Sequence, residues 1–191
     1  MARSIMSSLT STASKPFAPS LGLAHYAALF GIGALLALIH QGWDFRLQLP
    51  GHYGLVWMAG VMLTRHWSAA RWAATGTVLG YIGGTALLTH GAHASLMQTP
   101  FYALSTLAID AAWLLGAARM RQLALVGLLG GIAFMLKPIA VYALANGLNV
   151  QLGTLRFGAV FPLITHFCFG AVGAVIGTLM YGAGSKRDSS R

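Results

Sequence analysis

The chain is poor in acidic residues and in charge of either sign. Of its 191 residues, 3 are Asp or Glu and 12 are Lys or Arg, so that 8% are charged. A soluble globular domain carries charge on roughly 25% of its residues, and the composition therefore excludes that class. So few acids also leave no paired carboxylates for general acid–base hydrolysis.

Cysteine is equally scarce. Cys168 is the single cysteine, so the chain can form neither an internal disulfide nor a two-cysteine metal motif. The sequence also contains no phosphate-binding loop and no Ser-His-Asp set that would lie at one depth. We therefore expect that the chain is not an enzyme, does not hydrolyse ATP by itself and carries no cofactor.

Apolar residues are abundant, at 57% of the chain, and they occur in long runs between short polar breaks. Runs of about 20 residues are long enough to cross a bilayer as helices. We predict an all-α, polytopic membrane protein, with a disordered cytoplasmic tail over residues 1–20, a transmembrane domain over 21–182 and a basic cytoplasmic tail over 183–191. The six expected spans cover residues 21–40, 50–64, 72–89, 101–118, 122–145 and 157–181.

The cations are distributed unevenly between the two sides of these spans. With a cytoplasmic N-terminus, nine Lys and Arg residues fall inside, and only Arg46 and Arg156 fall outside. This bias follows the positive-inside rule and requires an even number of crossings. We therefore expect six spans with both termini cytoplasmic, in a bacterial inner membrane. The net charge of +9 then sets topology, and we predict no binding to nucleic acid.

Three ionisable residues are expected at one depth inside the membrane. Asp110, Lys137 and His166 each lie eight or nine residues below the outer end of a predicted span, which is about 12–15 Å at the helical rise of 1.5 Å. Such groups are costly in lipid and are typical of functional sites. One interpretation is a substrate chamber that opens outward. The other, of equal weight, is an Asp110–Lys137 ion pair that only fixes helix packing.

Further polar and aromatic residues are expected near the outer surface. His52, Trp57 and Asn146 complete the candidate substrate-binding set, although Trp57 equally suits an aromatic anchor at the membrane interface. His90 and His93 could bind a transition metal from one helical face, but this pattern is weak. We therefore predict no metal site.

Small residues recur at four-residue spacing, and the last span reads PLITHFCFGAVGAVIGTLMYG. With its six-span architecture, the chain resembles the substrate-binding S components of energy-coupling factor (ECF) type ABC transporters. The resemblance implies capture of a vitamin-like micronutrient from outside, and energy from a separate transmembrane coupling protein and ATPase subunits. It also implies a partner interface on the first span, at Ala24 and Ala28 or at Ala27 and Gly31.

Two alternatives stay open beside this vitamin-uptake hypothesis. The chain could be a structural or assembly subunit that docks onto a larger membrane complex through its small residues. A membrane redox or metal-binding anchor is a further possibility, although only His166 lies well inside a predicted span. In every case we expect membrane lipid to surround the protein.

Overall fold

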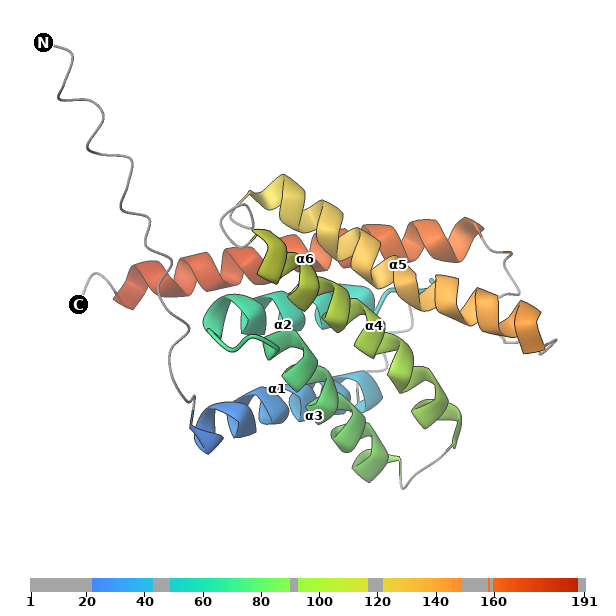
Figure 1. Cartoon of the computed structure of the whole chain (residues 1–191), viewed down its shortest axis with the longest axis horizontal. Coiled ribbons are helices and arrows are strands. Elements are labelled where there is room, and N and C mark those ends of the chain that lie inside the picture. Colours follow the sequence, from blue (N-terminus) through green and yellow to red (C-terminus); the bar gives the residue numbers. More distant parts are fainter. Residues whose placement is uncertain are drawn as a thin grey trace, which may run out of the picture.

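The computed structural model describes residues 22–42, 49–89, 93–116, 122–148, 158 and 160–188, and side chains are described throughout except at 93–98, 148 and 184–188. This part of the chain is all-helical, as predicted, and contains no strand. The expected tail over residues 1–20 lies outside it. The six helices, shown in Figure 1, are α1 (Leu23–Gly42), α2 (Gly54–Trp67), α3 (Ala73–Leu88), α4 (His93–Gly116), α5 (Leu123–Leu148) and α6 (Val160–Asp188).

Each predicted span corresponds to one helix, but several ends differ. Helix α4 begins at His93, eight residues before the predicted start, and continues through Pro100. Helix α6 continues to Asp188, so that residues 183–188 extend the last helix where a tail was expected. A proline is tolerated inside an apolar helix when neighbouring groups satisfy the freed backbone carbonyl.

Three helices are long and apolar enough to cross a membrane, and they indicate a membrane protein. These stretches are Leu23–Gly42, Leu123–Gly147 and Val160–Ala183. Helix α3 is also apolar but shorter, with 16 residues, and α2 has 14. At 1.5 Å per residue, α2 and α3 are roughly 21 and 24 Å long, less than the hydrocarbon core of about 30 Å.

Helix α1 begins and α6 ends at the same end of the molecule (Figure 1). We call this the proximal end, and the opposite end the distal end. At the proximal end, His25 of α1 forms a hydrogen bond with Ser68, just after α2, with 2.6 Å between Nε2 and Oγ. His66 of α2 likewise contacts Thr178 of α6 at 3.2 Å. The start of α1, the end of α2 and the last part of α6 therefore lie together.

Glycines allow α1 and α3 to touch through their backbones. A Cβ atom on Gly33 of α1 would collide with the carbonyl oxygen of Thr77 in α3. A Cβ on Gly80 of α3 would collide in turn with the carbonyl oxygen of Phe30 in α1. Such close approach of small residues is how helices associate in lipid, where burial from water contributes little.

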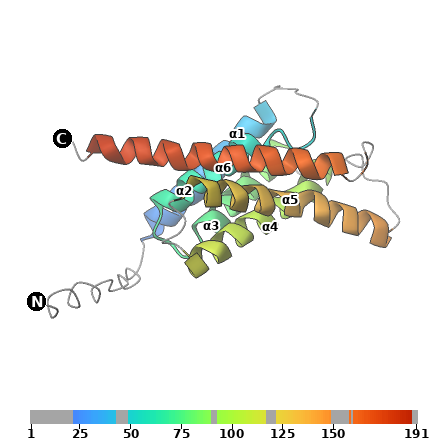
Figure 2. The same ribbon diagram turned by 90° about the horizontal axis from the view of Figure 1, so that it is seen from above.

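A second group of close helix contacts involves α6. A Cβ on Gly173 would lie 2.5 Å from the carbonyl oxygen of Leu55 in α2, and one on Gly170 would lie 2.7 Å from that of Gly130 in α5. Figure 2 shows α5 and α6 side by side along the longest axis of the molecule. These glycines therefore serve packing within the chain, between α1 and α3 and between α6 and its neighbours α2 and α5.

Candidate functional site

Six helices contribute side chains to one cluster of rings around a lysine, which we call the distal cluster. Five of its rings belong to buried residues, and the remaining members are half-buried. The distal cluster consists of His40 (α1), Tyr53 (the turn before α2), Trp57 (α2), Tyr81 (α3), Tyr102 (α4), Phe134 and Lys137 (α5), and His166 (α6).

The centre of the distal cluster is a set of three rings in mutual contact. The ring centroid of Trp57 lies 4.8 Å from that of Tyr81 and 4.9 Å from that of Tyr102, and Tyr81 and Tyr102 are 5.1 Å apart. The indole Nε1 of Trp57 donates a hydrogen bond to Ser105 Oγ at 3.2 Å. Tilted rings at these distances attract one another beyond simple burial. The three side chains therefore form a rigid wall between α2, α3 and α4.

Lys137 lies beside this wall. Its Nζ donates a hydrogen bond to Tyr102 Oη at 3.0 Å and lies 4.2 Å from the centroid of the same ring. The residue is half-buried and lies near both His40 and His166. Among the described residues, the one ion pair joins Arg65 to Asp110, so no described carboxylate neutralises the Lys137 ammonium.

The turn before α2 is fastened to α1 by aromatic and polar contacts. The ring of His40 stacks on that of Tyr53 with 3.8 Å between centroids, and its Nδ1 forms a hydrogen bond with the hydroxyl of Tyr81. Tyr53 Oη donates a hydrogen bond to the carbonyl oxygen of Leu36 at 2.5 Å. These contacts place the turn over one side of the distal cluster.

The same turn also presses against α6. Gly51 has a φ of 79°, and a Cβ on it would lie 2.6 Å from the imidazole Nδ1 of His166. That Nδ1 donates a hydrogen bond to the carbonyl oxygen of Pro162 at 2.7 Å, and the ring stacks on Phe134 with 5.1 Å between centroids. Non-helical backbone inside a membrane protein is tolerated where it is covered by protein or lines a cavity. This turn explains why α2 is short.

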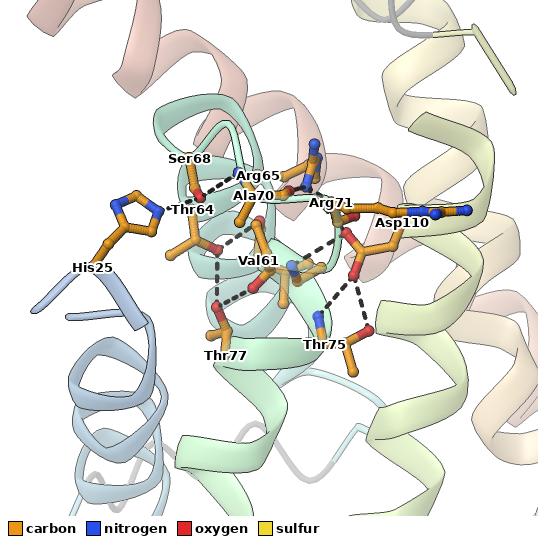
Figure 3. A network of polar contacts seen from close by, with 12 residues as sticks. His25, Val61, Thr64, Arg65, Ser68, Ala70, Arg71, Thr75, Thr77 and Asp110 are labelled. Atoms are coloured by element: carbon orange, nitrogen blue, oxygen red, sulfur yellow. Dashed lines mark hydrogen bonds and ion pairs between the residues drawn. The ribbon is translucent and has the colours of Figure 1, made fainter. Parts of the chain in front are cut away.

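Asp110 lies at the proximal end, close to Arg65 and Thr75 (Figure 3). Its Oδ2 accepts hydrogen bonds from the backbone N–H and the hydroxyl of Thr75, at 2.9 and 2.8 Å, and its Oδ1 accepts one from the backbone N–H of Ala74 at 3.2 Å. The side chain therefore caps the N-terminus of α3, where a negative charge is favoured. Its ion-pair partner is Arg65, with 3.4 Å between Nη1 and Oδ1.

The predicted Asp110–Lys137 pair is therefore wrong. Lys137 contacts Tyr102, which precedes Asp110 by eight residues on α4, or about 12 Å along the helix. The expected depth was misplaced because α4 begins at His93, so that Asp110 lies six residues from the end of the helix at Gly116. Of the three residues predicted at one level, the structure brings Lys137 and His166 together and separates Asp110.

Arg65 was expected only as a cytoplasmic topology signal, and its role in the fold was missed. The side chain is buried, and Nη1 donates hydrogen bonds to the carbonyl oxygens of Ala70 and Arg71. Its guanidinium carbon lies 5.1 Å from the ring centroid of Trp113. Asp110 is an acidic residue inside a predicted span, and such a residue needs a cation as its partner. This need was the signal in the sequence that could have identified Arg65.

The other predicted site residues fall in different places. Trp57 belongs to the distal cluster, and His52 lies near it, with Nδ1 donating to the carbonyl oxygen of Leu49 at 2.8 Å. Asn146 is exposed on α5. His90 and the side chain of His93 lie outside the described residues, and within the described part no three His, Cys, Asp or Glu side chains group to hold a metal ion.

The residues predicted as a partner interface are all exposed along α1. Ala24, Ala27, Ala28 and Gly31 lie on the surface, and a Cβ on Gly31 would meet no atom within 4 Å. By contrast, Gly33 of the same helix faces α3. Helix α1 thus has one small-residue face used for internal packing and another that is open.

Comparison of the chain with protein-family models, with curated proteins and with solved structures finds no match.

Proposed function

We propose that the chain is a six-span membrane protein that binds a vitamin-like small molecule at the distal cluster and serves as the substrate-binding subunit of an uptake transporter. The observation that carries the proposal is Lys137, a half-buried cation held by Tyr102 among aromatic rings, with no carboxylate partner among the described residues. Ligand sites typically combine apolar and aromatic walls with a few placed polar groups. The distal cluster has this composition.

The orientation follows from the two ends of the bundle. The proximal end holds the start of α1, the end of α6, and two cations, Arg65 in the last turn of α2 and Arg71 between α2 and α3. Under the positive-inside rule this end faces the cytoplasm, which places the distal cluster toward the outer side of a bacterial inner membrane. A site there would receive its substrate from outside.

Energy for uptake must come from other subunits, because the chain contains no nucleotide-binding loop. We propose a transmembrane coupling protein and ATPase subunits as partners. The open face of α1, formed by Ala24, Ala27, Ala28 and Gly31, would admit a helix of the coupling protein closely.

A second candidate function is that of a structural or assembly subunit. It is favoured by Asp110, whose carboxylate is fully used by Arg65 and by the N-terminus of α3. In this interpretation, the charged groups only fix the fold, and the open face of α1 docks onto a larger complex. The isolated chain would then be unstable and would copurify with a partner at fixed stoichiometry.

Ligand capture by the purified protein tests the first proposal. The full chain is isolated in mild detergent, bound compounds are sought by native mass spectrometry, and candidates are titrated by tryptophan fluorescence. His166→Ala should weaken binding, whereas His25→Ala, which alters a histidine at the proximal end, should not. If no compound binds saturably and His166→Ala leaves stability unchanged, the proposal fails.

A further inference from the structure

We infer that the ligand of the distal cluster is an organic anion, whose carboxylate pairs with the Lys137 ammonium and whose flat apolar body contacts the surrounding rings. This inference rests on the proposed function and specifies its substrate class. It follows from three features: a cation that no described carboxylate neutralises, the small number of acids in the chain, and aromatic residues of the cluster that are only partly buried.

The first feature is the hydrogen bonding of the ammonium. Lys137 Nζ can donate three hydrogen bonds, and Tyr102 Oη accepts one of them at 3.0 Å. The ring of Tyr102 supplies a cation–π contact at 4.2 Å. Neither contact neutralises the charge, and a charge removed from water is stabilised mainly by an opposite charge with matching hydrogen bonds. A bound carboxylate would supply both.

The second feature is the scarcity of acids that could perform this role internally. The chain has 3 acidic residues. Asp110 is engaged by Arg65 at the proximal end, and Asp188 is the last residue of α6, also toward that end. Asp44, two residues beyond α1, lies outside the described residues, and it is therefore included in the test below.

The third feature is the surface around Lys137. His40 and Tyr53, whose ring centroids lie 3.8 Å apart, are each only partly buried, so the cluster reaches the surface at these two residues. Trp57 and Phe134 are fully buried rings of the same cluster. Faces of this kind favour a planar, unsaturated group, because offset and edge contacts between rings are attractive. A planar body with one carboxylate matches the charge and the walls together.

The test uses two probes of nearly equal shape, benzoate and benzamide, which differ in charge. The thermal unfolding midpoint of the full chain in detergent is measured as a function of each probe. Benzoate should raise the midpoint and benzamide should not. For Lys137→Met, the apparent Kd for benzoate should rise by about 30-fold or more, the typical effect of removing one partner of a buried charge pair.

Matched variants separate this effect from general damage. Lys137→Arg should retain benzoate binding, because it keeps the charge, and Arg71→Gln should bind as the wild type, because it removes an exposed cation at the proximal end. If Lys137→Met does not fold, Tyr102→Phe gives a second test: it releases the ammonium from its hydroxyl partner and should preserve the preference for benzoate over benzamide.

Four outcomes would overturn the inference. The first is an equal shift of the unfolding midpoint with benzamide and with benzoate, and the second is undiminished benzoate binding by Lys137→Met. The third is a neutral or cationic compound extracted from the purified wild type. The fourth is a midpoint shift by benzoate that occurs in Asp44→Asn but not in the wild type, which would identify Asp44 as the counterion of Lys137. Each of these outcomes leaves the proposed binding function standing. The proposed binding function fails separately if neither probe shifts the unfolding midpoint and no compound copurifies with the protein. If an anion copurifies with the wild type but not with Lys137→Met, the inference is supported even if benzoate does not bind.

Discussion

Arg65 and Asp110 lie 45 residues apart in the sequence and form an ion pair of 3.4 Å, with 5% and 0% of their side chains exposed. The same carboxylate accepts hydrogen bonds from the first turn of α3, and the same guanidinium donates to the carbonyl oxygens of Ala70 and Arg71. One pair of side chains therefore joins α4 to the end of α2, to the following turn and to the start of α3.

Removing the carboxylate should be strongly destabilising. In Asp110→Ala, the Arg65 charge stays buried without its partner and the N-terminus of α3 loses its cap. Breaking a buried ion pair in this way costs about 3–5 kcal/mol. The midpoint of thermal unfolding in detergent should fall accordingly. The double variant Arg65→Met/Asp110→Leu should recover part of the loss, and a single variant as stable as the wild type would contradict the ion-pair role.

Two glycines on α1 provide a matched test of the helix contacts. Gly33→Ala should destabilise the fold by about 1–3 kcal/mol, because the added Cβ meets the backbone of α3. Gly31→Ala adds the same atom on the open face and should be neutral or stabilising by up to about 1 kcal/mol, since alanine favours helix. Unfolding midpoints of the two variants would decide this. Equal effects would mean that α1 and α3 do not touch as described.

Gly51 and Gly158 separate backbone strain from contact with His166. Both glycines have positive φ, at 79° and 74°, but only a Cβ on Gly51 meets the His166 ring. Gly158→Ala should cost about 1–2 kcal/mol for the left-handed backbone, and Gly51→Ala should cost more and also weaken ligand binding. Stability and fluorescence titration measure the two effects. If both variants lose ligand binding, or if neither does, the turn at Gly51 has no specific effect on the binding site.

Labelling of the single cysteine, Cys168, tests whether α6 spans the membrane. Cys168 is exposed on α6, about 12 Å from its first residue, so in intact membranes lipid should shield it from a water-soluble maleimide. Detergent denaturation should restore labelling. Full labelling of native membranes would argue against α6 as a span.

Two introduced cysteines extend this measurement to orientation. In a Cys168→Ser background, Val160→Cys marks the distal end and Gly22→Cys the proximal end, and both positions are exposed. The reagent should label Val160→Cys from outside and Gly22→Cys only after the membrane is opened. The reverse pattern would overturn the proposed orientation.

The existence and order of the helices could be predicted from the sequence, because apolar runs and short polar breaks depend only on local composition. The sequence also shows small residues at four-residue spacing, and the structure assigns Gly33 and Gly80 to contacts within the chain. Helix ends were harder to predict. The fourth span was predicted to begin at residue 101, whereas the helix begins at His93 and continues through Pro100.

The error in the start of α4 gave Asp110 a wrong depth, and the ion pair of Asp110 with Arg65 was therefore not predicted. A shift of eight residues at the start of α4 moved the expected depth of Asp110 by about 12 Å, enough to associate it with Lys137 in place of Arg65. The participation of Tyr81 and Tyr102 in the distal cluster could not be read from the sequence either, since it depends on how α3 and α4 rotate about their own axes.

The two kinds of contact between helices have different mechanical consequences. Where α1 meets α3, and where α6 meets α2 and α5, backbone lies against backbone, and sliding would drive atoms into collision. The proximal ion pair and the distal rings instead connect these groups through buried side chains. The molecule therefore consists of two closely packed groups of helices, α1 with α3 and α6 with α2 and α5, and the side chains of α4 take part in both connections between them.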